Sequence, residues 1–201
     1  MTPDRSGIVA ETSAVILAGG RSSRMGRPKA GLPFRGGTLL SWQVEKLRGL
    51  GLRDIVIAGC GGAAEGVRAV GDVFPGRGPL SGIHAGLCAI ACEQALVLAV
   101  DTPLIPGAFL CELIERHRGG VTAASVNGRP EPLIGVYSRS LLPLCEELLR
   151  GTDTSVHRLL RDAEAALVEF DGDPELLAGC NTPEEYEKLL CLDRAGADDQ
   201  N

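Results

Sequence analysis

The sequence contains few aromatic residues, no long apolar run and no paired cysteine motif. Aromatic residues make up 3% of the chain, so its core must be built from Leu, Val, Ile and Ala. No apolar run approaches the roughly 18 residues that suggest a membrane-spanning helix, and residues 1–13 lack the apolar block of a signal peptide. The seven cysteines form no C-x-x-C pair. We therefore expect a cytoplasmic protein that does not associate with a membrane.

The charge balance of the chain is acidic. Its 20 lysine and arginine residues stand against 26 aspartate and glutamate residues, which gives a formal net charge of −6 at pH 7. Such a chain is a poor candidate for wholesale nucleic-acid binding, so we expect no nucleic-acid partner. The length of 201 residues suits one domain. We expect a single domain over residues 1–201, with flexible tails at 1–12 and 192–201.

Short apolar runs alternate with segments of helical periodicity. The run at 14–17 precedes two glycines and predicts a strand buried on both faces, as in a parallel sheet. Further strands are predicted at 54–58, 95–100, 121–126, 132–137 and 166–170, and helices at 38–50, 82–92, 106–118, 140–150, 155–162 and 183–190. This alternation predicts an α/β fold of the Rossmann-like, three-layer α/β/α type with a mostly parallel sheet. Ligands of such sheets bind beyond the carboxyl ends of the strands.

The segment that follows the first predicted strand is strongly cationic. No aspartate or glutamate occurs from residue 12 to residue 43. The basic residues of this window are Arg21, Arg24, Arg27, Lys29 and Arg35. Gly19 and Gly20 let backbone N–H groups approach an anion closely, and Arg24 and Lys29 can neutralise phosphate. We therefore expect a polyphosphate ligand, bound without a Walker A loop or a G-x-G-x-x-G motif, since neither is present.

Other residues extend this candidate site. Asp101 ends the strand predicted at 95–100, where a carboxylate can hold Mg²⁺ against phosphates or cap the next helix. The segment 78–82 predicts a tight loop that opens a helix and can bind an anion through its backbone. Asn181 precedes Thr-Pro-Glu, a pattern typical of a helix N-cap. Asp72 lies in a glycine-rich segment that also fits a surface turn.

Several motifs together resemble one family. Leu17-Ala18-Gly19-Gly20, Arg24-Met25-Gly26 and Lys29 fit the pattern L-A-G-G-x-x-x-R-M-G-x-x-K, which resembles nucleotidyltransferases of the glycosyltransferase-A type. Later motifs are Gly78-Pro79-Leu80-Ser81-Gly82, Asp101-Thr102-Pro103, Glu131-Pro132-Leu133 and Asn181-Thr182-Pro183-Glu184. With these motifs in this order, the chain resembles the molybdenum cofactor guanylyltransferase family, also called the molybdopterin-guanine dinucleotide biosynthesis protein A family, from about residue 13 to about residue 190. The fold that this implies is the nucleotide-diphospho-sugar transferase type.

The resemblance implies an enzyme that transfers GMP from GTP to the phosphate of molybdopterin and releases pyrophosphate, with Mg²⁺ as cofactor. It implies that Asp101 binds the metal, that Arg24, Lys29 and Asp101 are catalytic, and that Asn181 binds the second substrate. The nucleotide-binding residues that it implies are Leu17, Ala18, Gly19, Gly20, Lys29, Asp72, Gly78, Pro79, Leu80 and Asp101. We expect a monomer or weak homo-oligomer, with proteins that hand over the molybdenum cofactor as further partners.

Departures from the family pattern keep alternatives open. The family usually has N-x-N-T-P, whereas this chain has Gly179 in place of the first asparagine. A sugar phosphate or another small phosphate is therefore an alternative acceptor. The branch that uses CTP more often has L-A-A-G at the first loop, so Gly19 favours GTP over CTP. A non-catalytic nucleotide-binding module is the last alternative, and the joint presence of Lys29, Asp72 and Asp101 argues against it.

Overall fold

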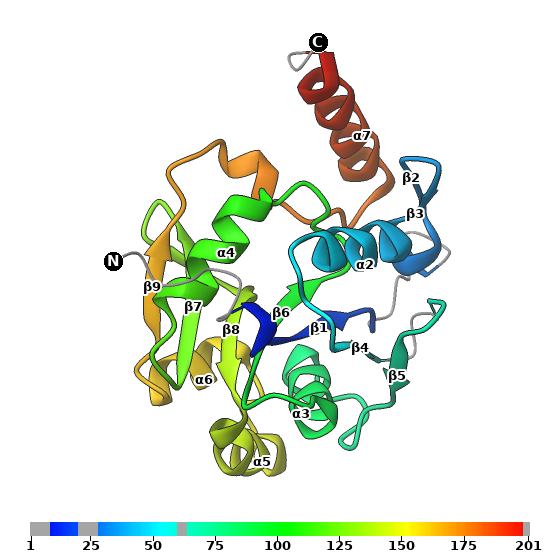
Figure 1. The fold of residues 1–201 in the computed structure, drawn as a ribbon. Helices are drawn as coiled ribbons and strands as arrows, with labels where there is room; N and C mark the ends of the chain where they lie inside the picture. Colours follow the sequence, from blue (N-terminus) through cyan, green and yellow to red (C-terminus); the bar gives the residue numbers. More distant parts are fainter. Residues whose placement is uncertain (1–8, 20–27, 60–63, 199–201) are drawn as a thin grey trace.

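A computed structural model describes residues 9–19, 28–59 and 64–198 of the chain. At its centre is a seven-stranded sheet in the order β5-β4-β1-β6-β8-β7-β9 (Figure 1). The strands are β1 (Ser13–Leu17), β4 (Ile55–Ala58), β5 (Arg68–Val70), β6 (Gln94–Ala99), β7 (Val121–Val126), β8 (Arg129–Ser138) and β9 (Ala166–Glu169). The pairings of β8 with β6 and β7 are antiparallel, and the other pairings of this sheet are parallel. The prediction of a mostly parallel sheet is confirmed.

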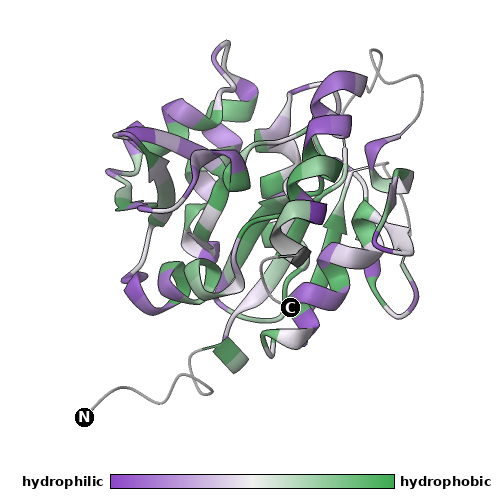
Figure 2. Cartoon of the chain, turned by 90° about the horizontal axis from the view of Figure 1, so that it is seen from above, coloured by the Kyte–Doolittle hydropathy of each residue, from purple (hydrophilic) through white to green (hydrophobic). Residues whose placement is uncertain are grey.

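Helices cover both faces of the sheet (Figure 1). One face packs against α2 (Leu39–Gly49) and α4 (Gly107–Arg116), and the other packs against α3 (Pro79–Ala89), α5 (Leu142–Arg150) and α6 (Val156–Asp162). Neighbouring residues of β1 separate accordingly, because Ile16 lies in the first apolar cluster and Val15 in the second. Figure 2 shows the apolar segments gathered along the central strands. The predicted three-layer α/β/α arrangement is therefore confirmed.

The strand order reverses next to β1. This strand pairs with β4 on one side and with β6 on the other. The chain passes from β1 through α2 to β4, and it reaches β6 later through α3. At such a switch point a crevice opens beyond the carboxyl ends of the two strands, and ligands of open α/β sheets bind there. The two ends are joined by a hydrogen bond of 3.1 Å from the N–H of Val100 to the carbonyl oxygen of Leu17.

The segment between β1 and α2 contains elements that the sequence did not predict. A short 3-10 helix, η1 (Lys29–Gly31), leads into a hairpin of β2 (Pro33–Phe34) and β3 (Gly37–Thr38). Arg35 stands at the turn with a φ of 46°, a conformation that non-glycine residues seldom adopt. Its guanidinium lies 4.2 Å from the ring centroid of Trp42 in α2. The hairpin is thus packed onto α2.

The last helix, α7 (Pro183–Asp198), is longer than predicted and projects from the body of the fold (Figure 1). The prediction ended this helix at residue 190 and expected a flexible tail beyond. Asp193 instead forms an ion pair of 2.5 Å with Arg35, and the hydroxyl of Tyr186 donates to the carbonyl oxygen of Pro33. These contacts attach α7 to the β2–β3 hairpin. Among the described residues, the structure has no helix with the length and apolar character needed to cross a bilayer.

Candidate active site

Lys29, Asp101 and Asn181 meet at the carboxyl edge of the sheet. The Nζ atom of Lys29 donates to Oδ2 of Asp101 at 2.5 Å and to Oδ1 of Asn181 at 2.7 Å. The Lys29 and Asp101 side chains are 19% and 14% exposed, so this ion pair is mostly enclosed but remains accessible to solvent. A cation, a carboxylate and an amide from three distant segments therefore form one polar cluster at the switch point.

Asp101 lies in the loop between β6 and α4. The N-cap of α4 is Pro106, so Asp101 does not cap that helix. Its own carbonyl oxygen accepts a hydrogen bond of 3.2 Å from the N–H of Cys180. A Cβ atom added at Gly179 would lie 3.2 Å from both Cγ and Oδ2 of Asp101. A residue with a side chain at position 179 would therefore crowd the Asp101 carboxylate.

The side chain of Asn181 faces Lys29 because its neighbours cap α7. Glu185 accepts hydrogen bonds through Oε2 from the N–H groups of Asn181 and Thr182, at 2.5 and 3.2 Å. The N–H of Glu185 donates in turn to Oγ1 of Thr182 at 3.2 Å. This reciprocal pair is a capping box with Thr182 at the N-cap. The predicted N-cap pattern is present, with Thr182 as the cap and Pro183 at the first helical position.

At the end of β1 the described residues Leu17, Ala18 and Gly19 offer a ligand backbone groups and no polar side chain. Leu17 and Ala18 are buried, and the N–H of Ala18 donates to the carbonyl oxygen of Ala58 at 2.9 Å. Gly19 is exposed and packs directly on Gly59, where an added Cβ would lie 2.6 Å from the Cα of Gly19. Sequence reasoning missed Gly59, although a glycine directly after the buried strand 54–58 was a signal for it. Gly20 and Arg24, also predicted for the site, lie outside the described residues.

Asp72 and the start of α3 form a second part of the carboxyl edge. The Oδ1 atom of Asp72 is buried without a hydrogen-bond partner among the described residues, and burial raises the pKa of this carboxyl. Gly78 precedes α3 with a φ of 74°, and Pro79 follows it at the first helical position. Leu80 is fully buried in the core. Leu80 therefore belongs to the core, and the exposed residues at this end of α3 are Gly78 and Pro79.

A divalent cation fits this site only with help from a ligand. Among the described residues, no group of three or more His, Cys, Asp or Glu side chains could hold a metal ion. Asp101 supplies one carboxylate, which is 14% exposed. Mg²⁺ is commonly bound by one or two carboxylates together with phosphate oxygens and water. The residues present thus fit a cation that arrives with a polyphosphate.

Comparison with known proteins matches this geometry to a family. A family model described as MobA-like NTP transferase domain matches residues 14–168. A probable molybdenum cofactor guanylyltransferase of Carboxydothermus hydrogenoformans is 34% identical over 188 residues, covering 89% of this chain and 94% of the relative. A relative of the same name from Opitutus terrae is 36% identical over 188 residues, covering 88% and 93%.

A solved structure shares the fold. It is the molybdopterin-guanine dinucleotide biosynthesis protein A of Archaeoglobus fulgidus, which superposes with a TM-score of 0.72. The match covers 90% of this chain and all of the other at 20% identity. At that identity the likeness concerns the fold, and it agrees with the sheet order and layers described above.

Proposed function

The chain belongs to the MobA-like NTP transferase family, and from this premise we propose that it acts as a molybdenum cofactor guanylyltransferase. An oxygen of the molybdopterin phosphate forms a bond to the α-phosphorus of GTP. The bond from that phosphorus to the oxygen bridging to the β-phosphate breaks, and pyrophosphate leaves with the electron pair. The observation that carries the proposal is the cluster of Lys29, Asp101 and Asn181 at the switch point of the sheet.

The proposed reaction needs charge stabilisation more than proton transfer. The acceptor phosphate is already an anion near neutral pH, so no strong general base is required. Catalysis then depends on positioning and on electrostatic stabilisation. Lys29 is placed to exchange its contact with Asp101 for the phosphates of the nucleotide. From its place in the sequence, Arg24 would neutralise charge on the same phosphates or on the leaving pyrophosphate.

We propose that Asp101 holds Mg²⁺. When bound, the ion would offset charge on the phosphate oxygens. The place of the Asp101 carboxylate, partly exposed beside Lys29 at the carboxyl edge of the sheet, supports this role. Asn181, which faces the same carboxylate from across Lys29, is proposed to bind the acceptor.

On the nucleotide side, the proposal uses backbone groups and one carboxylate. Gly19 and Gly78 offer exposed backbone at the carboxyl edge of the sheet. Asp72, which is half-buried just after β5, is proposed to accept from a donor of the nucleoside. The choice of GTP over CTP is supported by the names of the relatives. The glycine at position 19 is weaker support for GTP than the sequence alone suggests, because the close contact with Gly59 already favours a glycine there.

The remaining proposals concern the setting of the enzyme. We propose that it works in the cytoplasm as a monomer or weak homo-oligomer and passes its product to a handover protein.

Burial raises the pKa of the Cys180 thiol to about 11, so this cysteine beside Asp101 stays protonated at neutral pH. A protonated thiol is a weak nucleophile, and the chemistry proposed here makes no use of it.

The direct test measures which nucleotide stabilises the folded chain. A ligand that binds only the folded state raises the unfolding midpoint according to its affinity. With Mg²⁺ present, we expect GTP to raise the midpoint more than CTP, ATP or UTP, and GTP with molybdopterin to yield pyrophosphate. A shift selective for CTP would overturn the guanylyl assignment. A shift with GTP but no release of pyrophosphate would favour a non-catalytic nucleotide-binding module, and no shift with any nucleotide would overturn the proposed function.

A further inference from the structure

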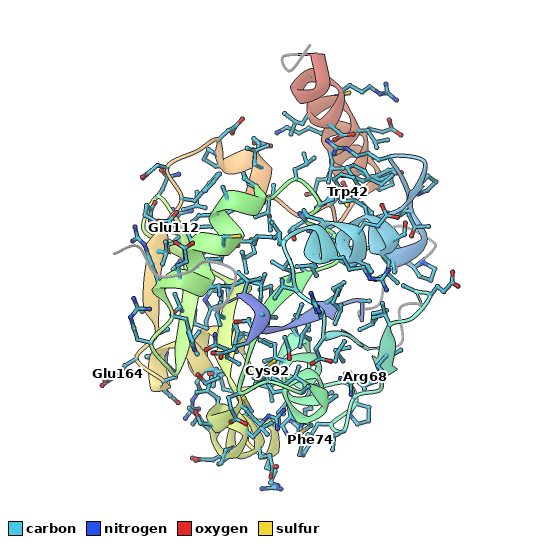
Figure 3. All side chains as sticks on the ribbon, viewed as in Figure 1. Trp42, Arg68, Phe74, Cys92, Glu112 and Glu164 are labelled. Carbon is cyan, nitrogen blue, oxygen red and sulfur yellow. The ribbon has the colours of Figure 1, made fainter. Side chains whose placement is uncertain are left out.

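The loop that carries Asp101 is held by side chains from one face of α2. Trp42, Gln43 and Lys46 each donate hydrogen bonds to carbonyl oxygens between residues 99 and 105. Their spacing places them on neighbouring positions of the helix surface. Trp42 lies between α2 and the base of α7 (Figure 3). We call these three residues the α2 brace.

Gln43 donates hydrogen bonds to the loop on both sides of Asp101. Its Nε2 atom donates to the carbonyl oxygen of Ala99 at 3.2 Å and to that of Thr102 at 3.1 Å. Carbonyl oxygens only accept hydrogen bonds, so this orientation of the amide follows from its partners. The two acceptors bracket Asp101 in the sequence. The Gln43 amide therefore helps to set their separation and the path of the backbone through Asp101, together with the bonds that Thr102 donates to the carbonyl oxygen of Ala99 through Oγ1 at 2.9 Å and N–H at 3.4 Å.

The position of Gln43 has a cost that packing alone does not explain. Gln43 is fully buried, and its Oε1 atom has no hydrogen-bond partner among the described residues. A buried acceptor without a partner costs about 1–3 kcal/mol. A leucine would fill a similar volume without that cost, although it would leave two carbonyl oxygens without this donor. Residues that break a local rule in this way are expected where function needs them.

Lys46 and Trp42 continue the brace along the loop. The Nζ atom of Lys46 donates to the carbonyl oxygens of Pro103 at 2.9 Å and Ile105 at 3.2 Å. The Nε1 atom of Trp42 donates to Pro103 as well, at 3.2 Å. Burial, with a smaller contribution from the positive charge of Arg35, lowers the pKa of Lys46 to about 7. A second polar side chain of α2 is thus desolvated in order to hold the same loop.

The same helix is tied to the segment that carries Lys29. The N–H of Leu39, the first residue of α2, donates to the carbonyl oxygen of Leu32 at 2.9 Å. Leu32 directly follows η1, whose first residue is Lys29. At one end α2 therefore fixes the backbone behind the cation, and along its side it fixes the backbone around the carboxylate.

We propose that Gln43 is a positioning residue for nucleotidyl transfer, which with Trp42 and Lys46 holds the Asp101 carboxylate at the correct place relative to Lys29. The inference rests on the function proposed above. Gln43 touches neither substrate nor metal, and it acts through the carbonyl groups of Ala99 and Thr102. A misplacement of about 1 Å at a reacting centre can cost about 100-fold in rate. Loss of the brace should therefore affect turnover more than nucleotide affinity.

The test compares Gln43→Leu with Val44→Ala. Val44 is the next residue of α2 and is also buried, but its side chain is apolar and donates no hydrogen bond to the loop. We expect Gln43→Leu to lower kcat by about 10–100-fold while KM for GTP stays within about threefold. The dissociation constant for Mn²⁺ in the presence of GTP should rise. Val44→Ala should lose stability and keep kcat and Mn²⁺ affinity. Equal kcat and Mn²⁺ affinity in the two variants would overturn the proposal.

A second variant keeps the test decisive if Gln43→Leu does not fold. Gln43→Glu preserves the shape of the side chain, and its neutral acid can donate one hydrogen bond whereas its carboxylate donates none. Relative to the unsubstituted protein, kcat and Mn²⁺ affinity of Gln43→Glu should fall as pH rises, and a constant ratio would contradict the proposal. If the unsubstituted protein shows no guanylyl transfer, the proposed function fails while the Mn²⁺ measurements still test the brace.

Discussion

The Nζ atom of Lys29 lies 2.5 Å from the Oδ2 atom of Asp101, although 72 positions separate the two residues in the sequence. A complex of a metal ion with a nucleotide requires a positive charge beside its phosphates and a negative charge beside its metal, and this pair supplies both. Phosphate oxygens would take the ammonium group, and the cation would take the carboxylate. Entry of such a complex would replace one ion pair with two, so neither charge would be left buried alone. This exchange links the binding of nucleotide to the binding of metal.

Replacing Lys29 with methionine should weaken nucleotide binding. Lys29→Met keeps much of the length of the side chain but removes the charge that neutralises phosphate. We expect the dissociation constant for GTP, measured by calorimetry with Mg²⁺, to rise at least about tenfold, since losing one partner of a desolvated charge pair costs about 2–5 kcal/mol. Lys188→Met is the matched control, because Lys188 pairs with Glu175 at 2.7 Å on an exposed face. An unchanged GTP affinity in Lys29→Met would contradict the phosphate role.

Replacing Asp101 with asparagine should remove the metal dependence of turnover. Asp101→Asn keeps the size of the side chain and an oxygen for Lys29, but it loses the negative charge that a hard cation needs. We expect kcat to fall at least about 100-fold and Mn²⁺ binding to be lost.

Asp54→Asn is the control for the same change of charge at a distant place. Asp54 precedes β4, at the amino end of the sheet, and accepts hydrogen bonds from Ser13, Arg68 and the N–H of Ala91. This control should lose stability but keep kcat. Full divalent-dependent turnover in Asp101→Asn would exclude the proposed metal ligand.

Much of the fold could be predicted because its central strands β1, β4 and β6 are buried on both faces. A strand such as β1 then shows an uninterrupted apolar run, which is a strong local signal. The same reasoning placed Asp101 at the end of β6 and the cationic segment after β1. Because both segments lie at the carboxyl edge of a parallel sheet, their meeting followed from topology. The reversed direction of β8 could not be read in this way, because strand pairing depends on distant partners.

The parts of the site that the sequence did not reveal depend on contacts between distant segments. Gln43 lies 56 positions from Ala99 and looks like an ordinary polar residue in a helix. In the sequence Lys46 resembles a solvent-exposed charge, and only the fold shows that it donates a hydrogen bond to the loop that follows β6. The role of Gly59 depends on its close contact with Gly19, which lies beyond the end of the neighbouring strand β1. Local patterns predicted which elements form, whereas these roles depend on how the elements pack.

Substitution of Gly59 should disturb the crossing of the β1 and β4 ends. Gly59 has a φ of 96°, and an added Cβ would lie 2.6 Å from Cα and 2.7 Å from N of Gly19. Neither contact involves a flexible side chain, so the backbone itself must move. We expect Gly59→Ala to lower the free energy of unfolding by about 2–4 kcal/mol, measured by urea denaturation, and to weaken GTP binding.

Gly76→Ala separates the two causes of this loss. Gly76 has a φ of 79°, and nothing lies within 4 Å of an added Cβ. Gly76→Ala should lower the free energy of unfolding only by the conformational cost of about 1–2 kcal/mol, and its affinity for GTP should not change. Equal losses in the two variants would show that the contact between Gly59 and Gly19 contributes little.

The buried position of Lys46 should appear in the pH dependence of stability. Burial lowers its pKa from 10.5 to about 7 in the folded state. Between these values the unfolded chain binds a proton that the folded chain does not, so stability rises with pH across this window. Below about pH 7 both states are protonated, and the cost of burying the charge is fully present. The slope should approach about 1.4 kcal/mol per pH unit.

Lys46→Met removes this contribution, so its stability relative to the unsubstituted protein should decline from pH 7 to pH 10. Urea denaturation at fixed pH values measures the difference, in which the titration of cysteines and tyrosines common to both proteins cancels. Val44→Ala, which alters the same helix without removing a titratable group, should run parallel to the unsubstituted protein. Parallel curves for Lys46→Met as well would show that the loop does not desolvate this lysine.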